Sequence, residues 1–166
     1  MEQSYKFRDI ETNMNQILSA LLKNNNFKKY IYYSSDNPLT EPDVSDSDMI
    51  LGKRIVPAPV SMKILDVSRI TMFFNYRKCS FRNQALSSII FIADLVIPIP
   101  LWSINSGDGQ RWIRITDEIA KELDQQLVTG IGEVSVGEPM PFPVNDEFAG
   151  ISIPIIVQGT TLKGVR

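Results

Sequence analysis

The chain has 166 residues, 43% of them hydrophobic, and its 17 basic and 19 acidic side chains give a net charge of −2. This length favours one domain with a sizeable core, and the near-balanced charge gives no electrostatic case for a dedicated DNA or membrane-surface binder. The single cysteine excludes an intrachain disulfide and favours a reducing environment, while the absence of histidine removes the commonest general base and metal ligand.

Two helical segments are predicted at the start of the chain. After Asp9, a good N-cap residue, apolar side chains recur at helical spacing as far as residues 24–26. They are Ile10, Met14, Ile17, Leu18, Leu21 and Leu22. Residues 27–33 fit either a short helix or a strand, and we favour the helix, with its aromatic residues packed in the core.

Residues 34–48 form a polar loop with two prolines, five acids and no base. A loop of this length in a small domain is usually functional or disordered. The spacing of Asp43, Asp46 and Asp48 invites comparison with a calcium loop, but the third oxygen ligand and the turn glycine are missing. We therefore expect a solvated loop and no metal site.

Strands follow. Residues 53–59 are a short extended piece, which Pro57 and Pro59 exclude from the interior of a sheet. Residues 69–78 alternate as a strand, and 78–84 read as a hairpin connection into residues 87–100, the longest apolar run. This run is rich in β-branched residues, so we expect it to be the central strand.

Both faces of the central strand are mostly apolar. One face consists of Ile89, Phe91, Ala93, Leu95 and Ile97. The other consists of Ile90, Ile92, Asp94 and Val96. A strand with one wet face should alternate apolar and polar residues, so we expect a neighbouring subunit or a loop to cover the second face. Asp94 could be an acid with a raised pKa, but with no partner group evident we favour a subunit contact.

A second amphipathic helix is predicted to begin near Gln110, after a flexible loop at 103–109, and to end at Gly130. Its apolar stripe is Trp112, Ile115, Ile119, Leu123 and Leu127. Residues 131–136 are predicted to form a strand. Residues 137–146 turn through three prolines and leave room for another short strand. The last strand, 149–157, contains Pro154, which assigns it to a sheet edge or a bulge.

This order of elements predicts one α+β domain spanning residues 1–166, with a loose tail at 158–166. We expect a mostly antiparallel sheet of four to five strands, with two amphipathic helices packed on one face. No remaining segment obviously covers the other face. A subunit of a larger assembly, with its sheet edges and apolar faces buried by neighbours, would explain this pattern.

No catalytic constellation stands out. The glycines of 130–137 follow a helix rather than a strand, and those of 107–109 lack a P-loop lysine, so they predict a turn and a hinge. Cys79 has basic neighbours but no histidine partner, which favours a structural thiol. We expect neither an enzyme nor a cofactor, with an unrecognised carboxylate hydrolase as a distant alternative.

Segments spread along the chain resemble the neck and tail-terminator (tail-completion) proteins of tailed bacteriophages. They are residues 17–31, the Asn37-Pro38-Leu39 loop, 53–57, 111–119, Gly130-Ile131-Gly132 and 148–153. The resemblance implies an α+β sheet with two helices, assembled as a hexameric ring that terminates the tail tube and joins it to the head connector. Its implied partners are copies of itself, tail tube or sheath subunits and head-completion proteins, with DNA passing transiently through the lumen.

The resemblance also implies a location in the virion neck or tail, after assembly in the bacterial cytoplasm, and no membrane contact. The N-terminus has no signal-peptide pattern, and the longest apolar run is too short and interrupted to span a bilayer. We expect the interface to include Ile90, Ile92, Asp94, Val96 and Pro154.

The acidic loop would then act as a docking arm or line the lumen, where acid would repel DNA. On that hypothesis, neutralising Asp43, Asp46 and Asp48 impairs joining or genome passage. The alternative function is a small cytosolic adaptor or regulatory domain that binds a partner by sheet-edge pairing.

Overall fold

The computed structural model describes residues 6–45, 50–83, 86–107, 109–128 and 132–158. Its helices are α1 (Lys6–Lys23), α2 (Asn25–Tyr32) and α3 (Arg111–Leu123). The strands of the main sheet are β1 (Ile55–Val56), β2 (Thr71–Asn83), β3 (Leu86–Pro98), β6 (Gln126–Val128), β7 (Gly132–Val136), β8 (Met140–Pro143) and β9 (Phe148–Gln158). A separate small sheet pairs β4 (Ser103–Ile104) with β5 (Gly109–Gln110). No helix in these ranges is long and apolar enough to cross a membrane.

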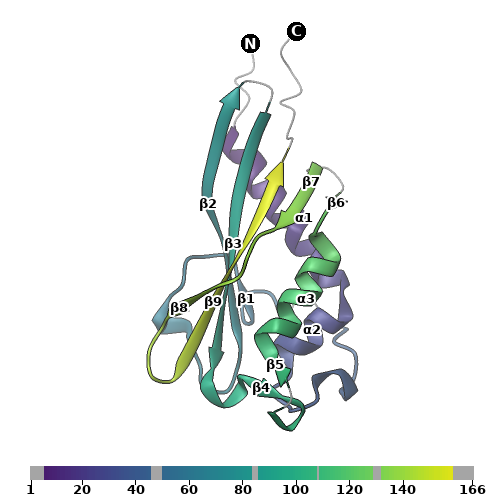
Figure 1. The fold of residues 1–166 in the computed structure, drawn as a ribbon, viewed down its shortest axis with the longest axis vertical. Coiled ribbons are helices and arrows are strands. Elements are labelled where there is room, and N and C mark those ends of the chain that lie inside the picture. Colours follow the sequence, from purple (N-terminus) through teal and green to yellow (C-terminus); the bar gives the residue numbers. More distant parts are fainter. Residues whose placement is uncertain (1–5, 46–49, 84–85, 108, 129–131, 159–166) are drawn as a thin grey trace.

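The main sheet has seven strands, six of them in the order β1-β2-β3-β9-β7-β6 (Figure 1). The seventh, β8, pairs with β9 on the same side as β7 but further along the strand. The α+β class is confirmed, but the sheet is larger than the four to five strands predicted. It is also mixed, because β1 runs parallel to β2 while the other pairs are antiparallel. The prolines after β1 do confine it to the sheet edge, as expected.

The apolar run at 87–100 forms β3, a central strand paired along its length with β2 and β9. The predicted connection at 78–84 is wrong for its larger part. Residues 78–83 continue β2 in register with β3, whereas the end of the predicted connection, residue 84, lies outside the described residues. The hairpin is therefore a long two-stranded arm, seen rising beyond the helices in Figure 1.

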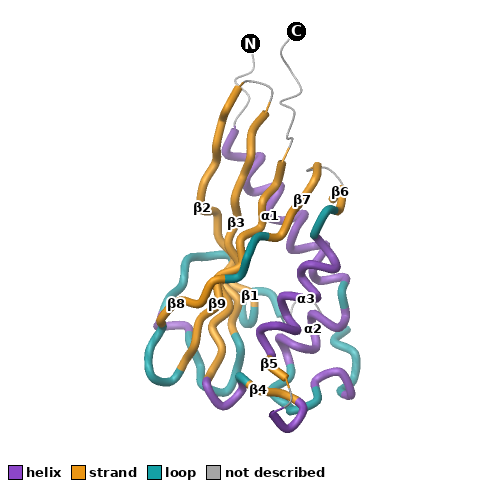
Figure 2. The backbone as a smooth tube through the Cα atoms, in the orientation of Figure 1, coloured by secondary structure: helices purple, strands orange, loops and turns teal. Residues whose placement is uncertain are grey.

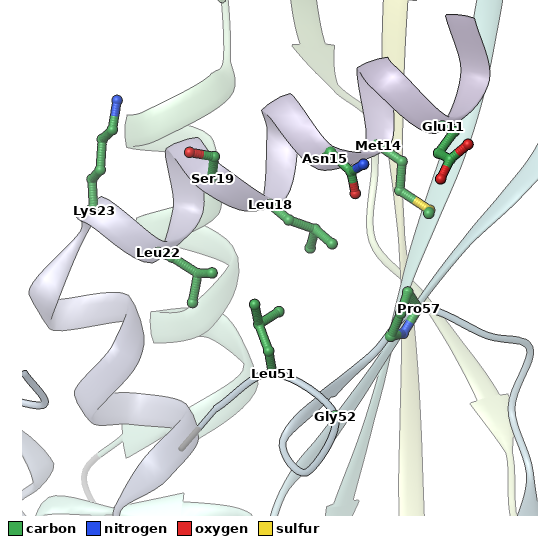
Figure 3. Close-up of a pocket in the computed structure, with 10 residues that line it drawn as sticks. All are labelled: Glu11, Met14, Asn15, Leu18, Ser19, Leu22, Lys23, Leu51, Gly52 and Pro57. Atoms are coloured by element: carbon green, nitrogen blue, oxygen red, sulfur yellow. The ribbon is translucent and has the colours of Figure 1, made fainter. Parts of the chain in front are cut away.

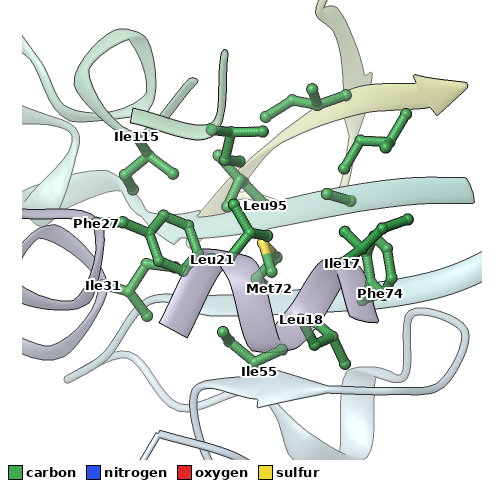
Figure 4. Close-up of a cluster of buried hydrophobic side chains, with 14 of the residues drawn as sticks. Ile17, Leu18, Leu21, Phe27, Ile31, Ile55, Met72, Phe74, Leu95 and Ile115 are labelled. Atoms are coloured by element: carbon green, nitrogen blue, oxygen red, sulfur yellow. The ribbon is translucent and has the colours of Figure 1, made fainter. Parts of the chain in front are cut away.

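Helices cover one face of the sheet (Figures 1 and 2). The core between them contains the predicted stripe of α1 and the predicted inner face of β3, with α3 contributing Ile115, Ile119 and Leu123. Phe74 of β2 and Phe91 of β3 stack in this core, with ring centroids 5.6 Å apart. Figure 4 shows Phe74 together with Ile17 and Leu21 of α1. Residues 27–33 contribute a third helix, α2, which confirms the helical alternative and places Phe27 and Ile31 in the same core.

Two helix ends differ from the prediction. α1 begins at Lys6, before the proposed cap at Asp9. α3 ends at Leu123 rather than at Gly130, because Gln125 takes a left-handed conformation with φ 56° and the chain turns back as β6. Asp124 stabilises this turn, since its Oδ1 accepts a hydrogen bond from the Val136 amide at 2.9 Å. Leu127, predicted in the helical stripe, belongs to β6.

Pro154 was predicted to put β9 at a sheet edge or at a bulge, and the edge is wrong because β9 is an interior strand. It pairs with β3 on one side and with β7 and β8 on the other. The Pro154 carbonyl accepts from the Gly137 amide at 2.8 Å, so the side of Pro154 that lacks an N–H faces the break between β7 and β8. The proline is tolerated because no ladder bond is required of it there.

Candidate functional site

The sheet face opposite the helices is covered by the chain itself at one end. Phe73, Val96 and Phe148 form a second buried cluster. The apolar side chains packed on it come from the segment after β1 and from the β8–β9 hairpin: Val56, Val60, Ile64, Leu65, Phe142 and Val144. Val96, a predicted interface residue, is therefore buried by a loop of its own chain and is unavailable to a neighbour.

The rest of this face carries no covering helix in the described chain. β2, β3 and β9 pass in front of α1 in Figure 2, with no helix drawn over them. We call the side chains that point to this side the open face: Ile90, Ile92, Asp94, Ser152, Pro154 and Ile156. The register pairs Ile92 with Pro154 and Ile90 with Ile156, so the structure brings together four of the five predicted β-strand interface residues.

The open face is only partly shielded. Ile92 is 6% exposed, whereas Ile90, Asp94, Pro154 and Ile156 are all half-buried. The Met140 side chain, which the register places beside Ser152, is 48% exposed. An apolar centre with a polar fringe is the usual composition of a protein–protein interface.

Asp94 is the charged group of the open face. Its Oδ1 accepts a hydrogen bond from the Ser152 hydroxyl at 2.6 Å. Burial raises the pKa of Asp94, an effect opposed by the Ser152 bond and by the positive charge of Arg77. Within the described residues no group of three or more Asp, Glu or Cys side chains could hold a metal ion.

The acidic loop is partly tied to the body of the protein. Asp43 accepts a hydrogen bond from Asn25 at 2.5 Å and pairs with Lys29 at 3.0 Å, both on α2. These contacts lower the pKa of Asp43, the Lys29 bond most strongly. Asp43 is therefore anchored rather than carried on a free arm, while Asp46 and Asp48 lie outside the described residues.

A groove of about 750 Å³ lies between α1 and the loop that carries Leu51, Gly52 and Pro57 (Figure 3). Its apolar lining comes from Met14, Leu18 and Leu22 of α1 together with Leu51 and Pro57. Glu11 lies toward one end of the groove and Lys23 toward the other (Figure 3). The groove is not evident from the sequence, because residues 51 and 57 are distant from α1 in the chain.

Arg111, a fully buried cation at the start of α3, was not predicted from the sequence. Its Nε donates to the Leu101 carbonyl at 2.9 Å, and its Nη2 donates to that of Ser35 at 2.7 Å. Its Nη1 reaches the carbonyls of Tyr33 at 3.0 Å and Tyr30 at 3.4 Å, at the end of α2. The available signal was its position four residues before Ile115, which puts a base on the apolar stripe of a helix.

Fold and site together define an α+β protein whose sheet is covered by helices on one face and left partly open on the other. The sequence model of the YomW family matches residues 24–157, from the N-cap of α2 into β9. The match spans most of the chain, and the chain belongs to the YomW family. The matched residues include the whole open face and Arg111. No curated protein matches the chain.

Proposed function

We propose that this protein is a structural virion protein of a tailed bacteriophage, forming a hexameric ring at the neck or the top of the tail. The ring terminates the tail tube, joins it to the head connector and lets the genome pass. Its partners are neighbouring copies, tail tube or sheath subunits and head-completion proteins.

The observation that carries the proposal is the open face. Ile90, Pro154 and Ile156 are half-buried in the single chain, and a sheet face with this composition is stabilised when a neighbour removes it from water. A face that meets a different surface of the next copy generates a ring if the rotation closes. Membership of the YomW family suggests a phage-associated origin, which is consistent with this role but does not assign a layer of the virion.

Negative-stain imaging with light scattering tests the proposal on the purified full-length chain. We expect ring-shaped particles with six-fold averages and a mass of about six chains, each of 18.8 kDa. A stable monomer across the accessible concentration range would contradict the ring and favour the adaptor alternative.

A further inference from the structure

The outer edge of β2 is the long unpaired edge of the described sheet. β1 pairs only with Met72 and Phe73, so from Phe74 to Asn83 no described strand lies beyond β2 (Figure 1). At about 3.3 Å per residue this edge is about 30 Å long. An edge of this kind is a template for an added strand.

The backbone groups that point outward can be assigned. The Met72 amide donates to the carbonyl of Arg54, the residue just before β1, at 2.7 Å, so the backbone polar groups of Met72 face the outer side. Because backbone N–H and C=O groups alternate in direction along a strand, those of Phe74 and Tyr76 also point to the outer side. The register with β3 shifts by one residue between Tyr76 and Lys78, after which Cys79 and Phe81 face outward.

Proline blocks the outer edge of β8 but not that of β2, and β6, the edge strand at the other end of the sheet, has only three residues. In β8, the backbone polar groups of Met140 and Phe142 point toward β9. Pro141 and Pro143 therefore occupy the outward positions, where proline has no N–H to donate. β1 is followed directly by Pro57. β2 contains no proline from Thr71 to Asn83. The chain thus suppresses strand addition at β8 and permits it at β2.

The basic residues of β2 indicate which kind of polypeptide segment can pair with its outer edge. Arg77, Lys78 and Arg82 lie within six residues, and no acid occurs between Asp66 and Asp94. Pairing of β2 with β2 of a second copy would bring these like charges together, which opposes self-association at this edge. We infer that the outer edge of β2 binds an acidic, extended polypeptide segment of a partner protein as an added strand. This inference does not depend on the ring.

Two nine-residue peptides test the inference by amide hydrogen exchange on the full chain. One alternates valine with glutamate, and its twin has lysine in place of glutamate. We expect the glutamate peptide to bind at least tenfold more tightly and to slow exchange at Phe74, Tyr76, Cys79 and Phe81. The amides of Phe73 and Asn75, which already face β3, should not change.

Charge reversal supplies the second arm of the test. Arg77→Glu with Lys78→Glu should reverse the preference between the two peptides, whereas Lys63→Glu with Arg114→Glu, both exposed bases elsewhere, should leave it unchanged. Circular dichroism checks that each variant folds. The inference is overturned if neither peptide binds, if both bind equally, if a thymidine oligonucleotide binds more tightly than the glutamate peptide, or if self-association protects the four amides.

Discussion

At the scale of single residues, Arg111 ties the helical layer together. Its guanidinium joins the end of α2, the segment after it and the chain before β4 through four backbone carbonyls. Burial lowers the pKa of Arg111 to about 10, opposed by the charge of Asp36, so the side chain stays protonated at neutral pH. Buried carbonyls left without donors are costly, which makes this one side chain a structural requirement.

Replacing Arg111 should therefore destabilise the protein strongly. We expect Arg111→Leu to lower the free energy of unfolding by about 3–5 kcal/mol, because the carbonyls lose their donors together. Arg111→Lys should recover only part of the loss, since an ammonium cannot reproduce the planar fork. Urea denaturation measures both, with the exposed Arg114→Leu as the control. Equal stability of Arg111→Leu and Arg114→Leu would contradict this role.

Asp43 gives a pH-dependent prediction. Lys29 and Asn25 bond to its ionised form and hold its pKa below the usual 3.8. A lowered pKa contributes stability that is present above the unfolded-state value and is lost as the pH falls through the folded-state value. Asp43→Asn should therefore lower Tm slightly at pH 7 and have no effect in strong acid, where Asp43 is protonated in both the folded and the unfolded state. Thermal melts across pH test this, with Asp146→Asn as the control. A Tm difference that persists in strong acid would rule it out.

At the scale of elements, the break between β7 and β8 organises the edge of the sheet next to β9. Gly137 lies against the Pro154 ring, where an added Cβ would come within 3.1 Å of Pro154 Cβ. Gly150 leaves room for the Phe142 ring, whose Cζ lies 2.5 Å from where a Cβ would be. Phe142 then packs on the cluster that closes one end of the second face.

A methyl group at position 150 should displace that ring. We expect Gly150→Ala to cost about 1–3 kcal/mol, the usual cost of overpacking. Adding Phe142→Leu should reduce the cost, because the smaller side chain removes the clash. A double-mutant cycle in urea measures the coupling, and strictly additive effects would contradict the proposed contact.

The sequence predicts the elements with strong periodicity and misses those decided by distant contacts. The stripes of α1 and α3 and the two apolar faces of β3 are readable because burial repeats at fixed spacing. β6 has only three residues, and its formation depends on the turn at Gln125 and on β7. For Pro154 the sequence leaves an edge and a bulge as alternatives, because it does not show that the neighbouring strand breaks opposite the proline.

The open face was predictable only in part. The period of two identified Ile90, Ile92, Asp94 and Val96 as a second apolar face. It could not show that residues 56–65 fold back over Val96, because that contact joins segments far apart in the chain. The partnership of Asp94 with Ser152 likewise depends on strand order.

At the scale of the whole molecule, three surfaces differ in what they offer to other proteins. The helical face is closed over the core, the open face presents half-buried apolar groups, and the β2 edge presents unpaired backbone. In our account, the open face meets the next copy in a ring, while the β2 edge receives a different chain. The two contacts use separate residues and can be removed independently.

The most direct test of the central claim is the mass of the assembly when the open face alone is altered. Ile90→Glu with Ile156→Glu places two charges on half-buried positions of that face, and Ile113→Glu places one on an exposed apolar position of α3. Sedimentation velocity should show the wild type and Ile113→Glu as rings of about six chains, and the double variant as a folded monomer. Rings of unchanged mass in the double variant, or a monomeric wild type, would contradict the assignment of the open face as the subunit interface.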